Sequence, residues 1–408
     1  MHATLTSALF PLAALAIATG CGPVTAQPLE YAPADDASAL QPLRDGGARD
    51  GGARDGGARD GGARDGGAPP DGGAPIDGGY VGADYGDLRV FDGLNLPAAS
   101  GGRTLPMRVR WSAQAPQPMP IVIWEHGGGY DPDGHRLSSE WSRTFAKAGY
   151  FVVHLAHVAP DAAQLTAMCA EVGVTDPAEC DDLSLDGMLD EETEANVFSS
   201  IAVARPTDVR RLLDGLPTLA SRVLQQQGVV LDIDRVAVAG WSGGSQAPMQ
   251  LAGALRTVSA SLPAFASPDA RPVAFVAISP QGPGYSGFFD TSWAGARGPL
   301  LVVTGEHDEK PANTLTGAVR RLAYDNLPPG QKHLWYSNID DPGIAHGSFN
   351  LGDQGSTDPE LMALSAGLTA VVVGFCDAYV KADPAALSWL AGTGPTAASP
   401  GLIEWESR

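Results

Sequence analysis

Short apolar runs alternate with longer segments of helical periodicity along the chain from about residue 80 onward. The apolar runs have the length of buried strands and lie at 120–124, 151–155, 236–239, 273–278, 299–304 and 332–337. The segments with helical spacing lie at 138–149, 207–227, 246–258, 313–324 and 360–381. Continuously apolar strands that alternate with helices are typical of parallel sheets covered on both faces. We therefore expect an α/β fold with a mostly parallel central sheet, preceded by a hairpin-like pair of strands at 88–96 and 104–111.

The first 79 residues have a different pattern. Residues 8–18 form an apolar segment of signal-peptide length. Two cleavage sites compete: a lipobox-like sequence that ends at Cys21, which would be lipidated, and a small-residue site after Ala26. Either site predicts export, as a cell-envelope lipoprotein tethered to a membrane through Cys21 or as a secreted protein. Residues 27–79 contain five tandem Arg-Asp-Gly-Gly-Ala repeats with almost nothing to bury, which predicts a flexible tether.

Composition narrows the classes of partner. The chain has 408 residues and a formal net charge of −21, which argues against a nucleic-acid partner. Beyond the first 20 residues no run of 18 apolar residues predicts a membrane-spanning helix. We expect a globular domain over residues 80–408.

Residues 159–204 form an insertion longer than a strand-to-helix connection needs. Cys169 and Cys180 lie within it, and in an exported protein they are expected to close a small disulfide loop, with two free thiols as the alternative. The part at 171–194 carries ten acidic residues and no Lys or Arg, as an acidic, solvated lid would. Residues 182–187 resemble the start of an EF-hand loop, but Thr193 stands where a bidentate glutamate is needed, so no metal site is assigned.

The strand at 236–239 runs into Gly240-Trp241-Ser242-Gly243-Gly244, a G-x-S-x-G sequence. A sharp strand-to-helix turn strains the backbone of its central residue and leaves no space for side chains on either side, which is why glycines flank it. Such a turn exposes the hydroxyl of Ser242 at the end of the sheet and turns the amide of Gly243 toward it. The alternative is a tight turn with an idle serine.

A second glycine-rich segment follows the strand at 120–124. It reads His126-Gly127-Gly128-Gly129-Tyr130, and its glycines allow backbone amides to approach a reacting carbonyl closely. We expect Gly128 and Gly129, with Gly243, to form an oxyanion hole. Neither a P-loop nor a dinucleotide-binding spacing is present, so a nucleotide is not the expected ligand.

An acid and a histidine follow two later strands. Asp308 lies just past the strand at 299–304, where a carboxylate can hold an imidazole, and Glu306 and Glu309 are alternates in the same loop. His346 lies in the loop after the strand at 332–337, and His307 and His333 compete with it. The chain order Ser242, Asp308, His346 is the order expected when these groups lie at successive strand ends of a hydrolase sheet.

These motifs make residues 85–381 similar to the α/β-hydrolases. The segment 205–216, Arg-Pro-Thr-Asp-Val-Arg-Arg-Leu-Leu-Asp-Gly-Leu, and the acid loop Gly305-Glu306-His307-Asp308 resemble those of dienelactone-hydrolase and platelet-activating-factor-acetylhydrolase-like esterases. The resemblance implies a catalytic triad of Ser242, Asp308 and His346, no cofactor, a monomer, and a small-molecule or lipid ester as substrate. The sequence departs from these families at Trp241, where histidine is usual, and at Gly243, where a larger residue is common.

The substrate is less well specified than the reaction. Aromatic residues near the motifs are expected to line an acyl or aryl pocket; they are Trp241, Tyr130, Phe288, Phe289 and Trp293. Short to medium acyl or aryl esters are the expected substrates. The alternatives are a polyester, cutin-type or lipid-ester hydrolase, and a non-catalytic surface binding module on the same fold.

Overall fold

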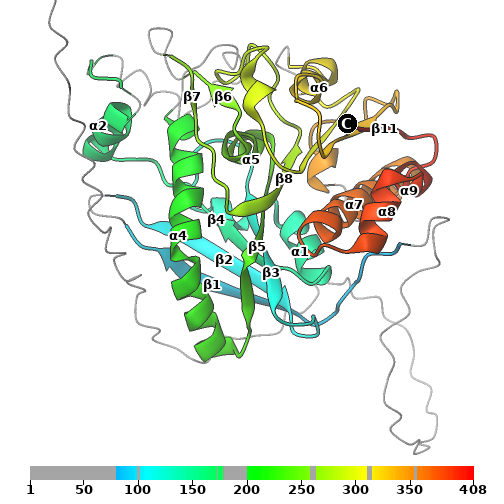
Figure 1. The fold of residues 1–408 in the computed structure, drawn as a ribbon, viewed down its shortest axis with the longest axis horizontal. Helices are drawn as coiled ribbons and strands as arrows, with labels where there is room; N and C mark the ends of the chain where they lie inside the picture. The colour runs from blue at the N-terminus through cyan, green and yellow to red at the C-terminus, as the bar shows by residue number, and fades with distance from the viewer. Residues whose placement is uncertain are drawn as a thin grey trace, which may run out of the picture.

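A nine-stranded mixed sheet organises the part of the chain that the computed structural model describes (Figure 1). These residues are 80–408 apart from 99–101, 172, 177, 179–199, 258–262, 310–314 and 353–355. The expected signal segment, Cys21, the repeat tether, Cys180 and most of the acidic part at 171–194 lie outside the described residues, so the expectations about them stay predictions.

The sheet has the order β1-β2-β4-β3-β5-β8-β9-β10-β11. Its strands are β1 Leu88–Leu96, β2 Leu105–Ser112, β3 Met119–Glu125, β4 Phe151–Leu155, β5 Leu231–Trp241, β8 Pro272–Ile278, β9 Leu300–Gly305, β10 Lys332–Ser337 and β11 Ile403–Ser407. A separate two-stranded sheet pairs β6 Leu255–Arg256 with β7 Phe265–Ala266.

The interior of the large sheet is parallel and its edges are antiparallel. All the pairings from β4 through β3, β5, β8 and β9 to β10 are parallel. The pairs β1–β2, β2–β4 and β10–β11 are antiparallel. The prediction of a mostly parallel α/β sheet with an antiparallel opening pair is therefore confirmed, and β11 was not anticipated because its sequence, Ile-Glu-Trp-Glu-Ser, is mostly polar.

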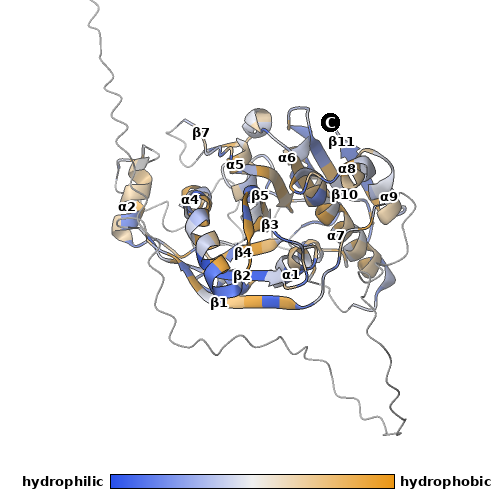
Figure 2. Ribbon diagram, turned by 60° about the horizontal axis from the view of Figure 1, so that its bottom comes forward, coloured by the Kyte–Doolittle hydropathy of each residue, from blue (hydrophilic) through white to orange (hydrophobic). Residues whose placement is uncertain are grey.

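Helices cover both faces of the sheet. They are α1 Ser139–Lys147, α2 Ala162–Glu171, α4 Ile201–Gln227, α5 Gln246–Ala252, α6 Gly317–Asp325, α7 Pro359–Tyr379, α8 Pro384–Ala391 and α9 Gly394–Ala398. Successive side chains of a strand point to opposite faces. Ile121 and Ile123 accordingly pack with α4 on one face, and Val122 and Trp124 pack with α1 and α7 on the other. Figure 2 shows the same separation, with α4 and α5 on one side of the sheet and α1 and α7 on the other.

Three helix boundaries differ from the predicted ones by more than two residues. Helix α4 begins at Ile201 rather than at 207, because buried Ile201, Ala202 and Val203 extend it ahead of Pro206. Helix α5 ends at Ala252 rather than at 258, because Gly253 adopts a φ of 115°. Helix α6 begins at Gly317, where the Thr316 side chain accepts a hydrogen bond from the amide of Val319.

Helix α7 has the length and composition of a membrane span, which was not expected from the sequence. In its most apolar stretch 61% of the residues are buried inside the molecule. Leu368, Val372 and Phe375 belong to the core cluster on the α1 side of the sheet, so this helix is part of the core.

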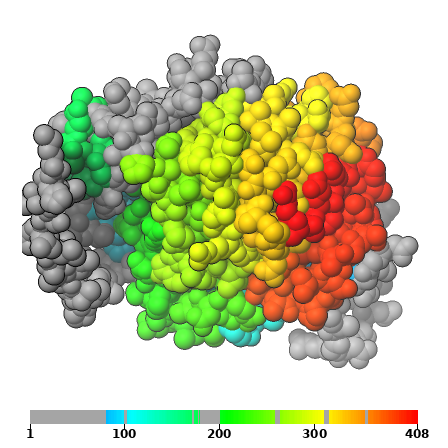
Figure 3. Space-filling view, turned by 45° about the horizontal axis from the view of Figure 1, so that its top comes forward, coloured from blue at the N-terminus to red at the C-terminus, as the bar shows by residue number. Residues whose placement is uncertain are grey.

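The C-terminal strand closes one edge of the sheet. Figure 3 shows it in red on the molecular surface, beside the yellow and orange segments that precede it. Arg321 of α6 holds it there through ion pairs with Glu404, at 2.7 Å, and with Glu406.

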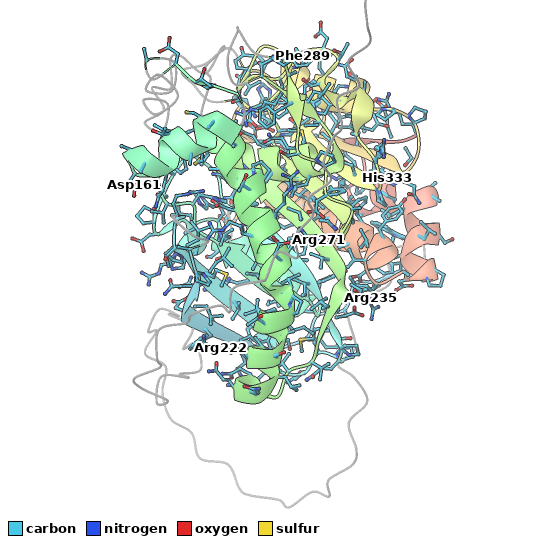
Figure 4. The ribbon with its side chains drawn as sticks, turned by 60° about the vertical axis from the view of Figure 1, so that its left-hand side comes forward. Asp161, Arg222, Arg235, Arg271, Phe289 and His333 are labelled. Atoms are coloured by element: carbon cyan, nitrogen blue, oxygen red, sulfur yellow. The ribbon has the colours of Figure 1, made fainter. Side chains whose placement is uncertain are left out.

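The loops that carry the predicted motifs follow β3, β5, β8, β9 and β10. Because these strands are parallel, all five loops leave the same edge of the sheet. Figure 4 illustrates the polarity: Phe289, after β8, lies at the top of the view, whereas Arg222, near the end of α4 that leads into β5, lies near the bottom of the ribbon.

Candidate active site

Ser242 occupies a strained turn between β5 and α5. Its φ is 54°, in the left-handed region that non-glycine residues rarely adopt. The flanking glycines are sterically required. A Cβ on Gly240 would lie 2.3 Å from the carbonyl oxygen of Gly244, and one on Gly244 would lie 2.2 Å from that of Glu125. The turn therefore has the geometry that the G-x-S-x-G spacing predicted.

The three predicted site residues form one chain of hydrogen bonds. His346 Nε2 lies 2.9 Å from Ser242 Oγ, and His346 Nδ1 lies 2.6 Å from Asp308 Oδ1. A carboxylate only accepts, so Nδ1 donates to Asp308 and Nε2 is left to accept the serine proton. The indole of Trp241 packs on the imidazole, with ring centroids 4.8 Å apart.

The alternates in the same loops have other partners. His307 Nε2 lies 3.0 Å from Oδ1 of the exposed Asp340, and Glu306 accepts a hydrogen bond from the Tyr336 hydroxyl. His333 lies between the hydroxyl groups of Ser407 and Tyr379, at 2.8 Å from each. None of these three reaches Ser242 in the described hydrogen bonds.

Asp308 is fully buried and is held from two further sides. Thr304 Oγ1 donates to its Oδ2 at 2.8 Å, and Arg320 Nε donates to its main-chain oxygen at 2.7 Å. Burial, the largest influence, raises the pKa of Asp308, but the Arg320 guanidinium and the hydrogen bond from His346 outweigh it and hold the pKa below its ordinary value. Asp308 is thus a carboxylate at neutral pH, as the partner of an imidazole must be.

The glycine segment after β3 packs against the serine turn. A Cβ on Gly127 would lie 2.4 Å from the Trp241 ring, and one on Gly243 would lie 2.3 Å from the carbonyl oxygen of Gly128. Gly128 itself has a φ of 75°. The glycine at position 243, unusual in the resembled families, is therefore explained by the close approach of Gly128. The structure brings Gly128, Gly129 and Gly243, the predicted oxyanion-hole residues, to the same edge as Ser242.

A buried network of charges lies behind the glycine segment. Arg103 Nη2 donates to Asp208 Oδ1 at 2.6 Å, and His157 bridges Asp208 Oδ2, at 2.9 Å, and Glu125 Oε2, at 2.5 Å. Arg205 Nη1 lies 3.6 Å from Glu125 Oε2. Burial disfavours the charged imidazole, but the two carboxylates outweigh it and raise the pKa of His157. Arg205 and Asp208 belonged to the motif that carried the family resemblance, whereas Glu125 and His157 were not assigned a role.

Two of the five aromatic pocket residues lie in the core. Trp293 is fully buried, donates to the Met249 sulfur at 3.2 Å and stacks on Phe288 at 5.4 Å, so the structure places Trp293 in the core rather than on a pocket wall. Phe288 is nearly as buried but also borders a cavity of about 420 Å³ together with Phe289. The other lining residues are Thr257, Pro283, Gly284, Gly287 and Asp290.

The other two aromatic residues lie closer to the motifs. Trp241 covers His346, and the Tyr130 hydroxyl lies 2.9 Å from Ser200 Oγ, directly after the glycine segment. Both are half-buried, as residues at the rim of a site are.

The two described cysteines, Cys169 and Cys376, are not part of the Ser242 site. Cys169 is disulfide-bonded, as predicted, while its expected partner Cys180 lies outside the described residues. Cys376 is a free thiol buried in α7, and burial raises its pKa, so it is an inert core residue.

No group of three or more His, Cys, Asp or Glu side chains in the described part of the chain has the arrangement of a metal site. The EF-hand-like residues 182–187 lie outside that part.

No model of a known protein family matches the chain, and no curated protein matches it in sequence.

Proposed function

We propose that the protein is a serine hydrolase of the α/β-hydrolase fold that cleaves carboxylic esters through an acyl-enzyme on Ser242. The observation that carries this proposal is the continuous hydrogen-bonded chain from Ser242 through His346 to the buried Asp308. A strained serine at a strand end, next to a histidine whose other nitrogen is held by a carboxylate, matches the requirements of nucleophilic acyl transfer.

The first half of the reaction forms the acyl-enzyme. Ser242 Oγ attacks the ester carbonyl carbon and its proton passes to His346 Nε2. The oxygen of the tetrahedral intermediate takes the negative charge and accepts hydrogen bonds from the amide of Gly243 and from amides of Gly128 and Gly129. Collapse of the intermediate breaks the ester bond, and the alcohol leaves with the proton from His346.

The second half regenerates the enzyme. Water attacks the acyl carbon and gives its proton to His346, and the carboxylic acid leaves as Ser242 recovers its proton. Asp308 stays ionised throughout and stabilises the imidazolium. No cofactor takes part in these steps.

The substrates that fit best are short to medium acyl or aryl esters. Trp241 packs on the His346 ring and offers half-buried aromatic surface beside the triad, and the half-buried Tyr130 directly follows the glycine segment. The cavity of about 420 Å³ at Phe288 and Phe289 is lined by none of the three triad residues, so the aromatic surface beside His346 carries the substrate proposal. We further propose that the enzyme is exported and works as a monomer, either secreted or tethered through Cys21.

Hydrolysis of p-nitrophenyl esters of rising chain length by the purified protein tests the proposal. We expect activity on the short chains and a loss of at least ~10³-fold in Ser242→Ala. Ser221→Ala is the matched control, because Ser221 is exposed on α4 and its hydroxyl donates only to the Pro217 carbonyl, at 2.9 Å. This control variant should retain full activity.

Two results would change the assignment. A folded protein that hydrolyses none of the esters and is not labelled by a fluorophosphonate would contradict the proposal and favour a surface binding module. Activity confined to long-chain, lipid or polymeric esters would keep the mechanism and change the substrate class.

A further inference from the structure

Arg205 connects α4 to the backbone of the glycine segment. Its side chain is fully buried. Its Nη1 donates to the carbonyl oxygen of His126 at 2.8 Å, and its Nη2 donates to those of Gly128 and Gly129 at 2.7 and 3.2 Å. One guanidinium thus holds three carbonyl groups of a loop that lies more than 70 positions away in the sequence.

The Gly127 carbonyl is held by a different side chain. The Nδ1 of His126 lies 2.7 Å from the carbonyl oxygen of Gly127 and must be the donor, since a carbonyl only accepts. Burial, followed by the nearby Arg205 charge, lowers the pKa of His126 well below its ordinary value, so the ring is neutral. All four carbonyls from His126 to Gly129 therefore accept from buried side chains.

Fixing the carbonyls also fixes the amides. In a trans peptide unit the C=O and the following N–H point in opposite directions within one plane. The amides of Gly128, Gly129 and Tyr130 share peptide units with the held carbonyls of Gly127, Gly128 and Gly129. They consequently point away from the donors that hold those carbonyls.

We propose that Arg205 is a positioning residue that orients the amides of Gly128 and Gly129 as the oxyanion hole. This inference rests on the proposed ester hydrolysis, and it names the residue that orients the oxyanion hole for that reaction. Arg205 contacts no substrate; it acts through the loop that does. Donors that are already oriented need no reorganisation when charge develops on the substrate, which is what makes an oxyanion hole effective.

The surrounding charges keep the guanidinium in place. Glu125, at 3.6 Å, offsets its charge, and His157 links Glu125 to Asp208 and Arg103. A planar fork with five N–H groups can serve three carbonyls at once, whereas a lysine ammonium is a compact group with a different geometry.

A merely structural role for Arg205 makes a different prediction. Removal of a buried arginine that only supports the fold lowers the folded fraction and leaves the turnover of the folded molecules unchanged. Removal of a positioning residue lowers kcat of the folded molecules, and it weakens the binding of tetrahedral adducts more than the binding of substrate.

The test compares Arg205→Met/Glu125→Gln with Glu125→Gln alone and with Arg110→Met. Arg205 offsets part of the Glu125 charge, so the double variant removes both charges together and leaves no excess negative charge in the interior. Arg110 is the matched control because it is also buried and donates to a main-chain carbonyl, that of Ser139 at 2.9 Å, without contacting the glycine segment in the described hydrogen bonds. The readouts are kcat and KM for p-nitrophenyl acetate and the inhibition constant of a trifluoromethyl ketone, which binds as a tetrahedral adduct.

We expect the double variant to lose kcat by ~10- to 100-fold relative to Glu125→Gln, below the ~10²–10³-fold known for deletion of an oxyanion donor. KM should stay within about threefold, and the ketone should bind more weakly by the same factor as kcat/KM falls. Arg110→Met should retain the wild-type kcat in its folded fraction. A folded double variant with the kcat and ketone affinity of Glu125→Gln would overturn the inference.

Two further measurements cover the other outcomes. If the double variant does not fold, Arg205→Lys keeps the charge and loses the fork, and a wild-type kcat in that variant would overturn the inference. Amide hydrogen exchange of residues 126–130 reads the order of the loop without any activity. The exchange rate should rise in Arg205→Lys and stay unchanged in Arg110→Met. Equal exchange rates in the two variants would contradict the inference. This readout also holds if the wild type hydrolyses no ester and the proposed function has failed.

Discussion

The glycine segment after β3 and the acid loop after β9 are held in the same way and contribute different chemistry. Each is held from behind by a buried arginine on a helix: Arg205 of α4 donates to carbonyls of the glycine segment, and Arg320 of α6 donates to the carbonyls of Asp308, Ser279 and Pro280. In the proposed mechanism the glycine segment supplies backbone amides to the site, whereas the acid loop supplies one carboxylate.

The two arginines differ in what their charge does. The charge of Arg205 is offset by Glu125; Arg205 orients the glycine segment, and its charge acts there only by helping to keep the His126 ring neutral. Arg320 lies 3.5 Å from Oδ1 of Asp308 and lowers the pKa of that carboxyl, so it orients the loop and also stabilises the ionised acid. Backbone amides need only the correct orientation. A carboxylate needs the correct orientation and must also be kept in one protonation state.

The largest expected effect in this comparison belongs to Asp308→Asn. An amide in place of the carboxylate holds His346 in the wrong tautomer, so we expect kcat for p-nitrophenyl acetate to fall by about 10⁴-fold with the fold intact. Asp340→Asn is the control, because Asp340 is exposed and pairs with His307. A loss below tenfold in Asp308→Asn would show that the acid loop contributes only structure.

Arg320→Met should have the next largest effect and should separate the two arginines. Loss of its charge raises the pKa of Asp308, so the acid limb of kcat/KM should move to higher pH, with a decrease of ~10- to 100-fold at neutral pH. The acid limb of Arg205→Met/Glu125→Gln should stay in place. The same displacement in both variants would remove the distinction between orientation and charge.

Gly243→Ala tests the contact between the glycine segment and the serine turn. The new Cβ would lie 2.3 Å from the Gly128 carbonyl oxygen, and backbone cannot move aside cheaply. We expect a loss of about tenfold in kcat and of about 1–3 kcal/mol in the free energy of unfolding, measured by chemical denaturation. Gly86→Ala is the control, since its Cβ would meet only Gln114, at 3.8 Å. An unchanged Gly243→Ala variant would refute the close approach.

The smallest expected effect is a pH dependence of stability. The pKa of Asp308 is lower in the folded protein than its ordinary value of 3.8, so the folded state binds this proton less readily than the unfolded state. Its contribution to stability is present above that ordinary value and is lost as the pH falls through the folded value. The difference in unfolding free energy between wild type and Asp308→Asn should therefore narrow from pH ~6 to pH ~3. A difference that stays constant would show that the carboxylate is not stabilised by the fold.

Sequence patterns predicted one kind of feature well. The parallel strands, the serine turn and the order Ser242, Asp308, His346 depend on local sequence and on the polarity of a parallel sheet, and the structure brings all three residues together. The glycines that flank Ser242 could be predicted for the same reason, because the strained turn itself leaves no space for side chains at their positions.

Features that depend on distant partners could not be predicted. Nothing around Arg320 indicates that it donates to three carbonyls in two other loops, and Trp293 looks like a pocket residue until its place beneath Phe288 is known. Arg205 stood in a motif, but its partners lie 76 to 79 positions earlier in the chain. Helix ends were misplaced where one residue, such as Gly253, decided them.

Acid-quenched mass spectrometry of the protein mixed with p-nitrophenyl acetate is the most direct test of the proposed mechanism. We predict an acetyl group on the peptide that contains Ser242, present within the first turnover and absent from Ser242→Ala. Hydrolysis of the ester by the wild type with no acetyl group on Ser242 would contradict the mechanism.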